Sequence, residues 1–136
     1  MQYLDSSVLI AAYLSKDPHH EICRQFMRNL SSGHGDVVIS IFGLAEVAGY
    51  FSRNINPDAS QAIALLLRAM PHLTIIPHFV EIPSANLMEL CIEYGLSGAD
   101  ALHVIHAQSF LGVDEIVTLD HDFTRVRHLM KVTILR

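Results

Sequence analysis

Fourteen acidic residues occur in the chain, and four of them lie in segments that could bring carboxylates together: Asp5, Glu46, Asp100 and Asp120. Carboxylates that converge on one pocket raise one another's pKa unless a cation neutralises them. Ligand sets made only of oxygen atoms select hard cations such as Mg²⁺ or Mn²⁺. Ser7 and Thr118 would add hydroxyls, and Asp122 a further carboxylate, at the same place. These residue types therefore favour the binding of a divalent cation.

Short β-type segments alternate with longer helical ones along the chain. Strands are expected at Gln2–Asp5, Val37–Ser40, Leu73–Ile76, Glu115–Leu119 and Val132–Leu135, and helices at Ser7–Leu14, Pro18–Leu30, Ile41–Arg53, Asn56–Met70, Val80–Tyr94 and Ala99–Leu111. Strands rich in valine and isoleucine, with helices between them, indicate a parallel sheet covered on both faces. The predicted fold is an α/β/α sandwich of three layers with a five-stranded parallel sheet, and residues 1–136 are expected to form one domain.

Ligands bind such sheets beyond the carboxyl ends of the strands. Asp5 ends the first expected strand and Asp120 follows the fourth, so both are expected at the ligand-binding edge. Glu46 lies off the apolar stripe of its helix, where a solvated glutamate is the commoner case. Gly43 and Gly49 nevertheless flank Glu46 at helical spacing, although each glycine costs a helix about 1 kcal/mol against alanine. The two glycines indicate that something nearby needs space.

Helix capping is the competing interpretation of several of these residues. Asp5 could cap the following helix, although Ser6 or Ser7 could cap it equally well without a charge. Ser97 and Asp100 have the spacing of a capping box, with the aspartate shorter than the usual partner.

Two pairs of residues near the end of the chain also have more than one interpretation. Asp120 or Asp122 could cap the turn that follows, but two acids so close repel each other unless a cation lies between them. His103 and His106 follow Asp100 on one helix and could suggest a transition-metal site. No cysteine accompanies them, so a structural role is expected for both histidines.

Composition narrows the classes of protein to consider. The net charge of −5 argues against a protein held to nucleic acid by bulk positive charge. The longest apolar run, Val8–Leu14, is far shorter than the roughly 20 residues of a membrane span, and no signal peptide is expected. Cys23 and Cys91 form no metal-type spacing, which fits a reduced, cytoplasmic setting.

Four segments together resemble the PIN domain family, and more narrowly the VapC-like ribonuclease toxins of toxin–antitoxin pairs. The segments are "YLDSSVLIAAYL", "GLAEVAGYF", "LSGADALHVIHA" and "IVTLDHDF", in the order of the family and over nearly the whole chain. The resemblance implies the same five-stranded fold, a metal-dependent nuclease, dimerisation and a small antitoxin partner. The acidic quartet of the family maps to Asp5, Glu46, Asp100 and Asp120, and its supporting positions map to Ser7, Thr118 and Asp122. Ser7 stands where many relatives have asparagine, but serine is also usual there.

The resulting hypothesis is a cytoplasmic endoribonuclease that depends on Mg²⁺ or Mn²⁺ and cleaves RNA with a metal-activated water. Phosphates of the RNA would be held by Arg125, Arg127 and Lys131, with Arg53 adding charge elsewhere. The apolar stripes of Ile41–Arg53 and Asn56–Met70 would form a homodimer or receive the antitoxin. Two alternatives stay open: a PIN-like module that binds RNA or protein without cleaving, and a receiver-type phosphoacceptor domain.

Overall fold

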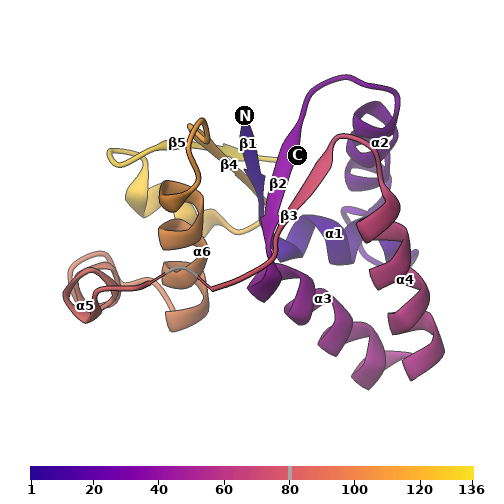
Figure 1. Cartoon of the computed structure of the whole chain (residues 1–136), viewed down its shortest axis with the longest axis horizontal. Coiled ribbons are helices and arrows are strands. Elements are labelled where there is room, and N and C mark those ends of the chain that lie inside the picture. Colours follow the sequence, from indigo (N-terminus) through magenta and orange to yellow (C-terminus); the bar gives the residue numbers. More distant parts are fainter. Residues whose placement is uncertain (80) are drawn as a thin grey trace.

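Five parallel strands form one sheet with helices on both faces in the computed structural model, which describes residues 1–79 and 81–136 (Figure 1). The strands are β1 (Gln2–Leu4), β2 (Val37–Ser40), β3 (Leu73–Ile76), β4 (Glu115–Thr118) and β5 (Lys131–Ile134). The helices are α1 (Ser6–Tyr13), α2 (His20–Ser31), α3 (Ile41–Asn54), α4 (Pro57–Ala69), α5 (Ser84–Ile92), α6 (Gly98–Ser109) and the short 3₁₀ helix η1 (His121–Val126). Within the described residues, no helix combines the length and apolar character needed to cross a membrane.

The strand order is β3-β2-β1-β4-β5. The strands β2 and β3 thus lie on one side of β1 and the strands β4 and β5 on the other, so the strand order reverses between β1 and β4. Leu4 pairs with Val117 at the carboxyl ends of these two strands. One residue further on, the Asp5 N–H donates to the Val117 carbonyl oxygen at 3.0 Å. Since ligands of doubly wound sheets bind where the strand order reverses, the fold sets this point at Asp5.

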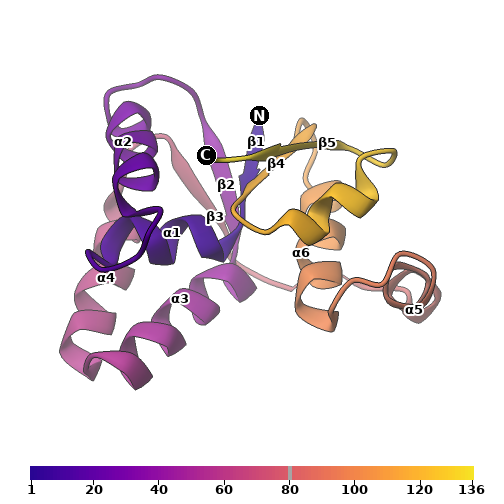
Figure 2. The same cartoon turned by 180° about the vertical axis from the view of Figure 1, so that it is seen from behind.

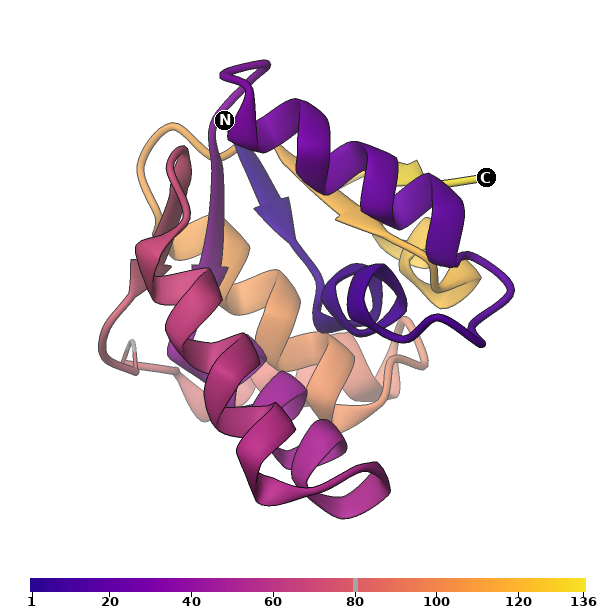
Figure 3. The same ribbon diagram turned by 90° about the vertical axis from the view of Figure 1, so that its right-hand side faces the viewer.

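Side chains alternate between the two faces of the sheet, and each face supports its own core. Leu4 and Val117 point into the core beneath α1, α2, α3 and α4. Tyr3 and Ile116, their neighbours in sequence, point into the core beneath α5, α6 and η1. Figure 2 shows the two helical layers from behind, and Figure 3 looks onto the layer that contains α1, α2 and α4. Burial on both faces explains why consecutive residues of these strands, Tyr3 with Leu4 and Ile116 with Val117, are apolar.

The fold class and all five strands agree with the sequence-based expectation, while two helices begin later than expected. The helix expected from Val80 begins at Ser84, because Pro83 disfavours helical geometry at the residue before it; Val80 itself lies outside the described residues. The helix expected from Pro18 begins at His20. Before it, the carboxylate of Asp17 accepts the His19 N–H at 2.7 Å, which holds Pro18 in a turn.

Candidate active site

Asp5 lies at the end of β1 and is only 4% exposed. Its Oδ2 accepts hydrogen bonds from Ser7 Oγ at 2.5 Å and from Thr118 Oγ1 at 2.7 Å. Ser7 Oγ also accepts the Leu119 N–H at 3.2 Å. The two hydroxyls expected beside the carboxylates therefore contact Asp5 directly and fix the orientation of its side chain.

Neither Asp5 nor the two serines cap α1 with a side chain, so the sequence-based expectation that Ser6 or Ser7 would take over capping is wrong. Asp5 occupies the N-cap position without a side-chain cap bond. Ser6 and Ser7 lie inside the helix, and their hydroxyls donate to carboxylates, Ser6 to Glu46 at 3.0 Å and Ser7 to Asp5. The start of α1 therefore uses its hydroxyls to bind carboxylates.

Glu46 points from α3 toward α6, where it meets a histidine that the sequence did not single out as a site residue. Glu46 Oε1 and His103 Nε2 lie 2.5 Å apart, and the same nitrogen lies 3.4 Å from Asp5 Oδ1. His103 is 1% exposed. Its Nδ1 hydrogen-bonds the Tyr3 hydroxyl at 2.7 Å, and that hydroxyl bonds Ser40 Oγ at 2.8 Å. His103 thus joins the two carboxylates to a buried polar chain.

The charges of this pair stabilise each other. Burial by itself lowers the pKa of His103, but the hydrogen bond to Glu46 and the charges of Asp5, Glu46 and Asp100 outweigh burial and raise that pKa above its usual value. Burial by itself raises the pKa of Glu46, but the hydrogen bond and charge of His103, with the Ser6 bond, lower it below its usual value. The arrangement therefore favours an imidazolium beside two carboxylates.

Asp100, Asp120 and Asp122 form a second group of carboxylates beside Asp5. Each offers one carboxylate oxygen, and these oxygens all lie within 4.8 Å of one another. Burial, followed by the charges of Asp120 and Asp5, raises the pKa of Asp100, although the Ser97 hydrogen bond opposes the shift. The charge of Asp5 thus acts on Asp100, which links it electrostatically to this second group.

Unlike the capping interpretation of Asp5, the capping interpretations of this second group are correct in part. Ser97 Oγ accepts the Asp100 N–H at 3.1 Å at the start of α6, which is one half of a capping box. Asp120 Oδ1 accepts the Asp122 N–H at 2.8 Å and caps η1. The Asp120 N–H donates to Thr118 Oγ1 at 3.0 Å. Backbone and hydroxyl bonds thus hold these carboxylates in place, while each keeps oxygen atoms for a ligand.

The oxygen atoms offered by Asp100, Asp120 and Asp122 fit a hard divalent cation. All of them belong to carboxylates, which suit Mg²⁺ or Mn²⁺. The raised pKa of Asp100 is caused in part by uncompensated negative charge, which a cation between Asp100, Asp120 and Asp122 would relieve. Asp5 and Glu46 already have His103 as a cationic neighbour. Among the described residues, the group of carboxylates that could share one cation thus includes Asp122, which the sequence assigned only a supporting place.

The PIN domain family model matches residues 2–129 of this chain. The chain belongs to the PIN domain family. The solved structures that share its fold include the following two. VapC20 of Mycobacterium tuberculosis, described as a toxin that cleaves the sarcin-ricin loop, is 21% identical with a TM-score of 0.66, covering 91% of this chain and 93% of that one. VapBC2 of Rickettsia felis, bound to a DNA fragment from its promoter, is 18% identical with a TM-score of 0.68 and covers 100% of both chains. No curated protein matches the chain significantly.

The basic residues expected to hold RNA lie in different parts of this PIN domain. Arg125 forms an ion pair with Asp122 at 3.1 Å, and so lies beside the acidic cluster of Asp100, Asp120 and Asp122. Arg127 is exposed just after η1. Lys131 begins β5 and pairs with Glu115 at 3.3 Å, at the amino ends of the strands. Because the acidic residues lie at the carboxyl ends, the structure does not bring Lys131 to them.

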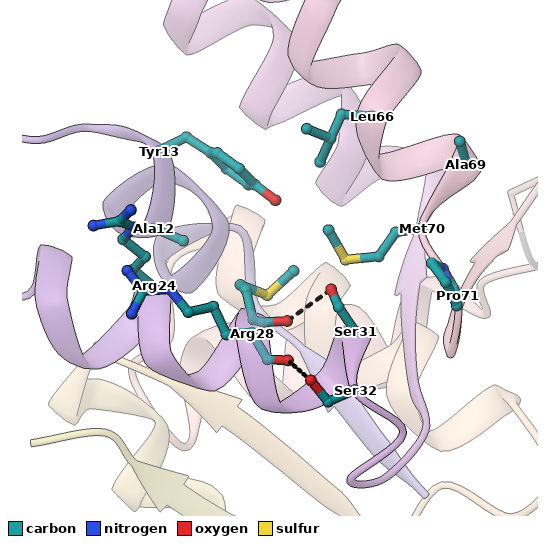
Figure 4. Close-up of a pocket in the computed structure, with 11 residues that line it drawn as sticks. Ala12, Tyr13, Arg24, Arg28, Ser31, Ser32, Leu66, Ala69, Met70 and Pro71 are labelled. Atoms are coloured by element: carbon teal, nitrogen blue, oxygen red, sulfur yellow. Dashed lines mark hydrogen bonds between the residues drawn. The ribbon is translucent and has the colours of Figure 1, made fainter.

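The PIN domain also has an apolar groove of about 720 Å³ between α1, α2 and α4 (Figure 4). Met27, Leu66 and Met70 contribute apolar side chains, and Arg24 and Arg28 line the α2 side. The apolar stripe of α4 is thus partly exposed, as the sequence suggested. The stripe of α3 is not, because its members lie in the core of the domain: Leu44, Val47 and Phe51. A docking role for that stripe of α3 is therefore wrong.

Proposed function

We propose that residues 1–136 form one PIN domain that acts as a Mg²⁺- or Mn²⁺-dependent endoribonuclease in the cytoplasm. The observation that carries the proposal is the meeting of carboxylates from four segments at the carboxyl ends of β1 and β4, where they act on one another electrostatically. The carboxylates are Asp5, Glu46, Asp100, Asp120 and Asp122. Membership of the PIN family supports a nuclease, and the fold shared with a toxin that cleaves RNA supports RNA as its substrate.

The residues of the site divide the work of such a reaction. Asp100, Asp120 and Asp122 would hold the cation, while Ser7 and Thr118 keep Asp5 oriented toward them. A bound Mg²⁺ or Mn²⁺ would lower the pKa of the attacking water and neutralise negative charge on the phosphoryl oxygens. Glu46, held by His103 and Ser6, adds a fixed carboxylate on the opposite side of Asp5.

Replacement of one cation ligand tests this proposal. Asp120→Asn removes a charged oxygen ligand, and we expect RNA cleavage in Mn²⁺ to fall at least about 100-fold, an effect of the size seen when single catalytic groups are lost. Asp58→Asn, the same exchange on the exposed start of α4, should leave the rate unchanged. Undiminished cleavage by folded Asp120→Asn protein would overturn the proposal. A wild type that binds RNA but never cleaves it would favour the non-cleaving module.

The receiver-type alternative has less support. Such domains pair acids near the first strand with a lysine that follows the fifth strand. Here Lys131 begins the fifth strand and pairs with Glu115 at the opposite edge of the sheet from Asp5. Incorporation of phosphate at Asp5 from acetyl phosphate, detected by mass spectrometry, would revive this alternative.

We infer further that the protein is a toxin whose antitoxin binds the apolar groove of Figure 4. The groove is apolar on its α4 side and has Arg24 and Arg28 on its α2 side, which suits an amphipathic segment with acidic residues. Co-purification with the product of the adjacent gene tests the inference. Leu66→Asp, inside the groove, should abolish the complex, whereas Leu65→Asp, exposed on the same helix outside the groove, should not. A complex unaffected by Leu66→Asp would contradict it.

A homodimer is proposed as well, on the basis of α5. Met88 and Ile92 lie one helical turn apart and are 53% and 72% exposed, which is unusual for large apolar side chains at this spacing. Light scattering should give twice the monomer mass for the wild type and the monomer mass for Ile92→Glu. Leu111→Glu, in a turn and 96% exposed, is the matched control and should remain a dimer. A wild-type monomer at micromolar concentration would refute the dimer.

A further inference from the structure

The face of α3 that carries Glu46 also carries aromatic and basic side chains. Tyr50 and Arg53 follow Glu46 at i+4 and i+7, and Phe42 precedes it at i−4, so all four lie along the same side of the helix. Together with Ser6 they line a pocket of about 440 Å³. Ser6 Oγ donates to Glu46 Oε1 at 3.0 Å, so this pocket shares Ser6 and Glu46 with the candidate active site.

Arg53 folds back along α3 onto Gly49, and only glycine allows this position. A Cβ atom at Gly49 would lie 2.8 Å from Arg53 Nη1, closer than real Cβ contacts come, and 3.7 Å from Cζ. The guanidinium therefore lies over Gly49, which is three residues or about 4.5 Å along the helix axis from Glu46. The space that the sequence suggested near Gly49 is filled by this side chain.

The charge of Arg53 has no carboxylate partner among residues 1–79 and 81–136. The arginine and lysine ion pairs of the described residues involve Arg28, Arg125 and Lys131 and leave Arg53 out. A planar guanidinium is suited to bidentate binding of phosphate. A cation that shares a pocket with Glu46, yet forms no ion pair among the described residues, can accept an anionic ligand without first breaking an ion pair.

The two aromatic side chains of the pocket are half-buried and anchored by neighbouring rings. The Phe42 ring lies 5.1 Å from that of His103 and 6.3 Å from that of His106, measured between centroids. The Tyr50 ring packs edge-on against Phe51 at 5.5 Å. Aromatic side chains held in this way can stack with a nucleic-acid base without any preference for sequence.

We propose that this pocket is a nucleotide-binding subsite for single-stranded RNA. Arg53 binds the phosphate next to the one that is cleaved, and the base of that nucleotide packs against Phe42 or Tyr50. The subsite rests on the proposed ribonuclease function, and it directs the RNA along α3 rather than toward Lys131. Its two kinds of contact, charge and stacking, make different contributions to binding and can be measured separately.

The test is the affinity of a fluorescent ten-nucleotide RNA, measured by anisotropy at several salt concentrations in Mg²⁺, in an Asp120→Asn background that prevents cleavage. Arg53→Ala should weaken binding about 5- to 10-fold and reduce the salt slope by about 0.7, the value for one phosphate contact on a single strand. Tyr50→Leu should weaken binding and leave the salt slope unchanged. Arg68→Ala, a matched arginine near the end of α4, should change neither.

Gly49→Ala provides a test that a folding defect cannot imitate. The added methyl group displaces the guanidinium of Arg53, so binding should weaken about threefold. Alanine is the better helix former, so the melting temperature should not fall. Unchanged affinity and salt slope in Arg53→Ala would overturn the subsite. The subsite would also be overturned if Arg53→Ala lost the dimer but still bound RNA, because Arg53 would then belong to a protein interface. Wild-type cleavage with an unchanged KM in Arg53→Ala rejects the subsite alone, whereas a wild type without cleavage or RNA binding rejects the proposed function.

Discussion

His103→Leu should remove the cation that separates Glu46 from Asp5. In the metal-free protein, His103 Nε2 contacts both carboxylates, at 2.5 Å and 3.4 Å, and its Nδ1 bonds Tyr3. Leucine has a similar volume but no charge and no hydrogen bond. The variant therefore leaves two acids close together without the partner that keeps them ionised, and we expect the free energy of unfolding to fall.

The size of the loss follows from burial. Removal of one partner from a buried ion pair costs about 3–5 kcal/mol. The Glu46 side chain is 30% exposed, so water screens part of the interaction, and we expect a loss of about 2–3 kcal/mol. At about 2.1 cal/mol/K of unfolding entropy per residue, a chain of 136 residues loses about 3.5 °C of melting temperature per kcal/mol. The expected decrease is about 7–10 °C.

The loss should depend on pH because the pKa of His103 is raised in the folded protein. A raised pKa contributes stability that is fully present below the unfolded value of 6.5 and is lost as pH rises through the folded value. For Glu46 the folded pKa is lowered, so its contribution is present above 4.5 and is lost as pH falls through the folded value. The groups that face His103 are Asp5, Glu46, Asp100 and Tyr3. The difference in the free energy of unfolding between the wild type and His103→Leu should thus be largest at about pH 6.

The assay is thermal unfolding in a chelator at a series of pH values from about pH 6 upward. The deficit of His103→Leu should shrink as pH rises through the raised pKa of His103, where the wild-type imidazole loses its charge. His106→Leu is the matched control, because His106 is equally buried on α6 but bonds the Leu102 carbonyl oxygen and contacts no carboxylate of the described residues. A deficit for His103→Leu that stays the same over the whole pH series would refute the electrostatic reasoning and leave packing as the cause.

Three further predictions concern the metal, a cap and a thiol. Mn²⁺ at about 100 times its Kd should raise the melting temperature by about 9 °C, which corresponds to 2.7 kcal/mol, and calorimetry should show no such rise in an Asp100→Asn, Asp120→Asn double variant. Ser40→Ala should lower the free energy of unfolding by about 1–2 kcal/mol in denaturant titrations, because Ser40 Oγ caps α3 and bonds Tyr3. Burial and the charge of Asp17 raise the pKa of Cys23 to about 11, so at neutral pH iodoacetamide should label only Cys91, as read by mass spectrometry.

The fold could be predicted from sequence because its signals are local. Valine and isoleucine identified four of the strands, β1 being the exception, and the parallel arrangement then followed from the helices between them. The start of α5 was wrong because an apolar helical pattern was given more weight than Pro83, whose ring restricts the preceding residue. Local covalent geometry determined where this helix begins.

The candidate site was less predictable because its contacts are between segments distant in sequence. Asp5 and Asp120 could be expected together, since parallel strands end at one edge of the sheet. His103 could not, because it lies 57 residues from its partner Glu46 in the sequence and on a different helix. The sequence drew attention to Gly43, but a Cβ there would lie 3.4 Å from His103 Cε1, which is about van der Waals contact, so this glycine does not identify the imidazole. Sequence pointed to the surroundings of Glu46 but not to the side chain that Glu46 contacts.

The most direct test of the central claim is the chemistry at the ends of the cleaved RNA, determined by mass spectrometry with wild-type protein in Mn²⁺ and in a chelator. Attack by a metal-activated water predicts 5′-phosphate and 3′-hydroxyl products in Mn²⁺ and no cleavage in the chelator. Cleavage that persists in the chelator and leaves a cyclic 2′,3′-phosphate would contradict the account, because the ribose hydroxyl would then be the nucleophile and the carboxylate cluster would have no part in activating water.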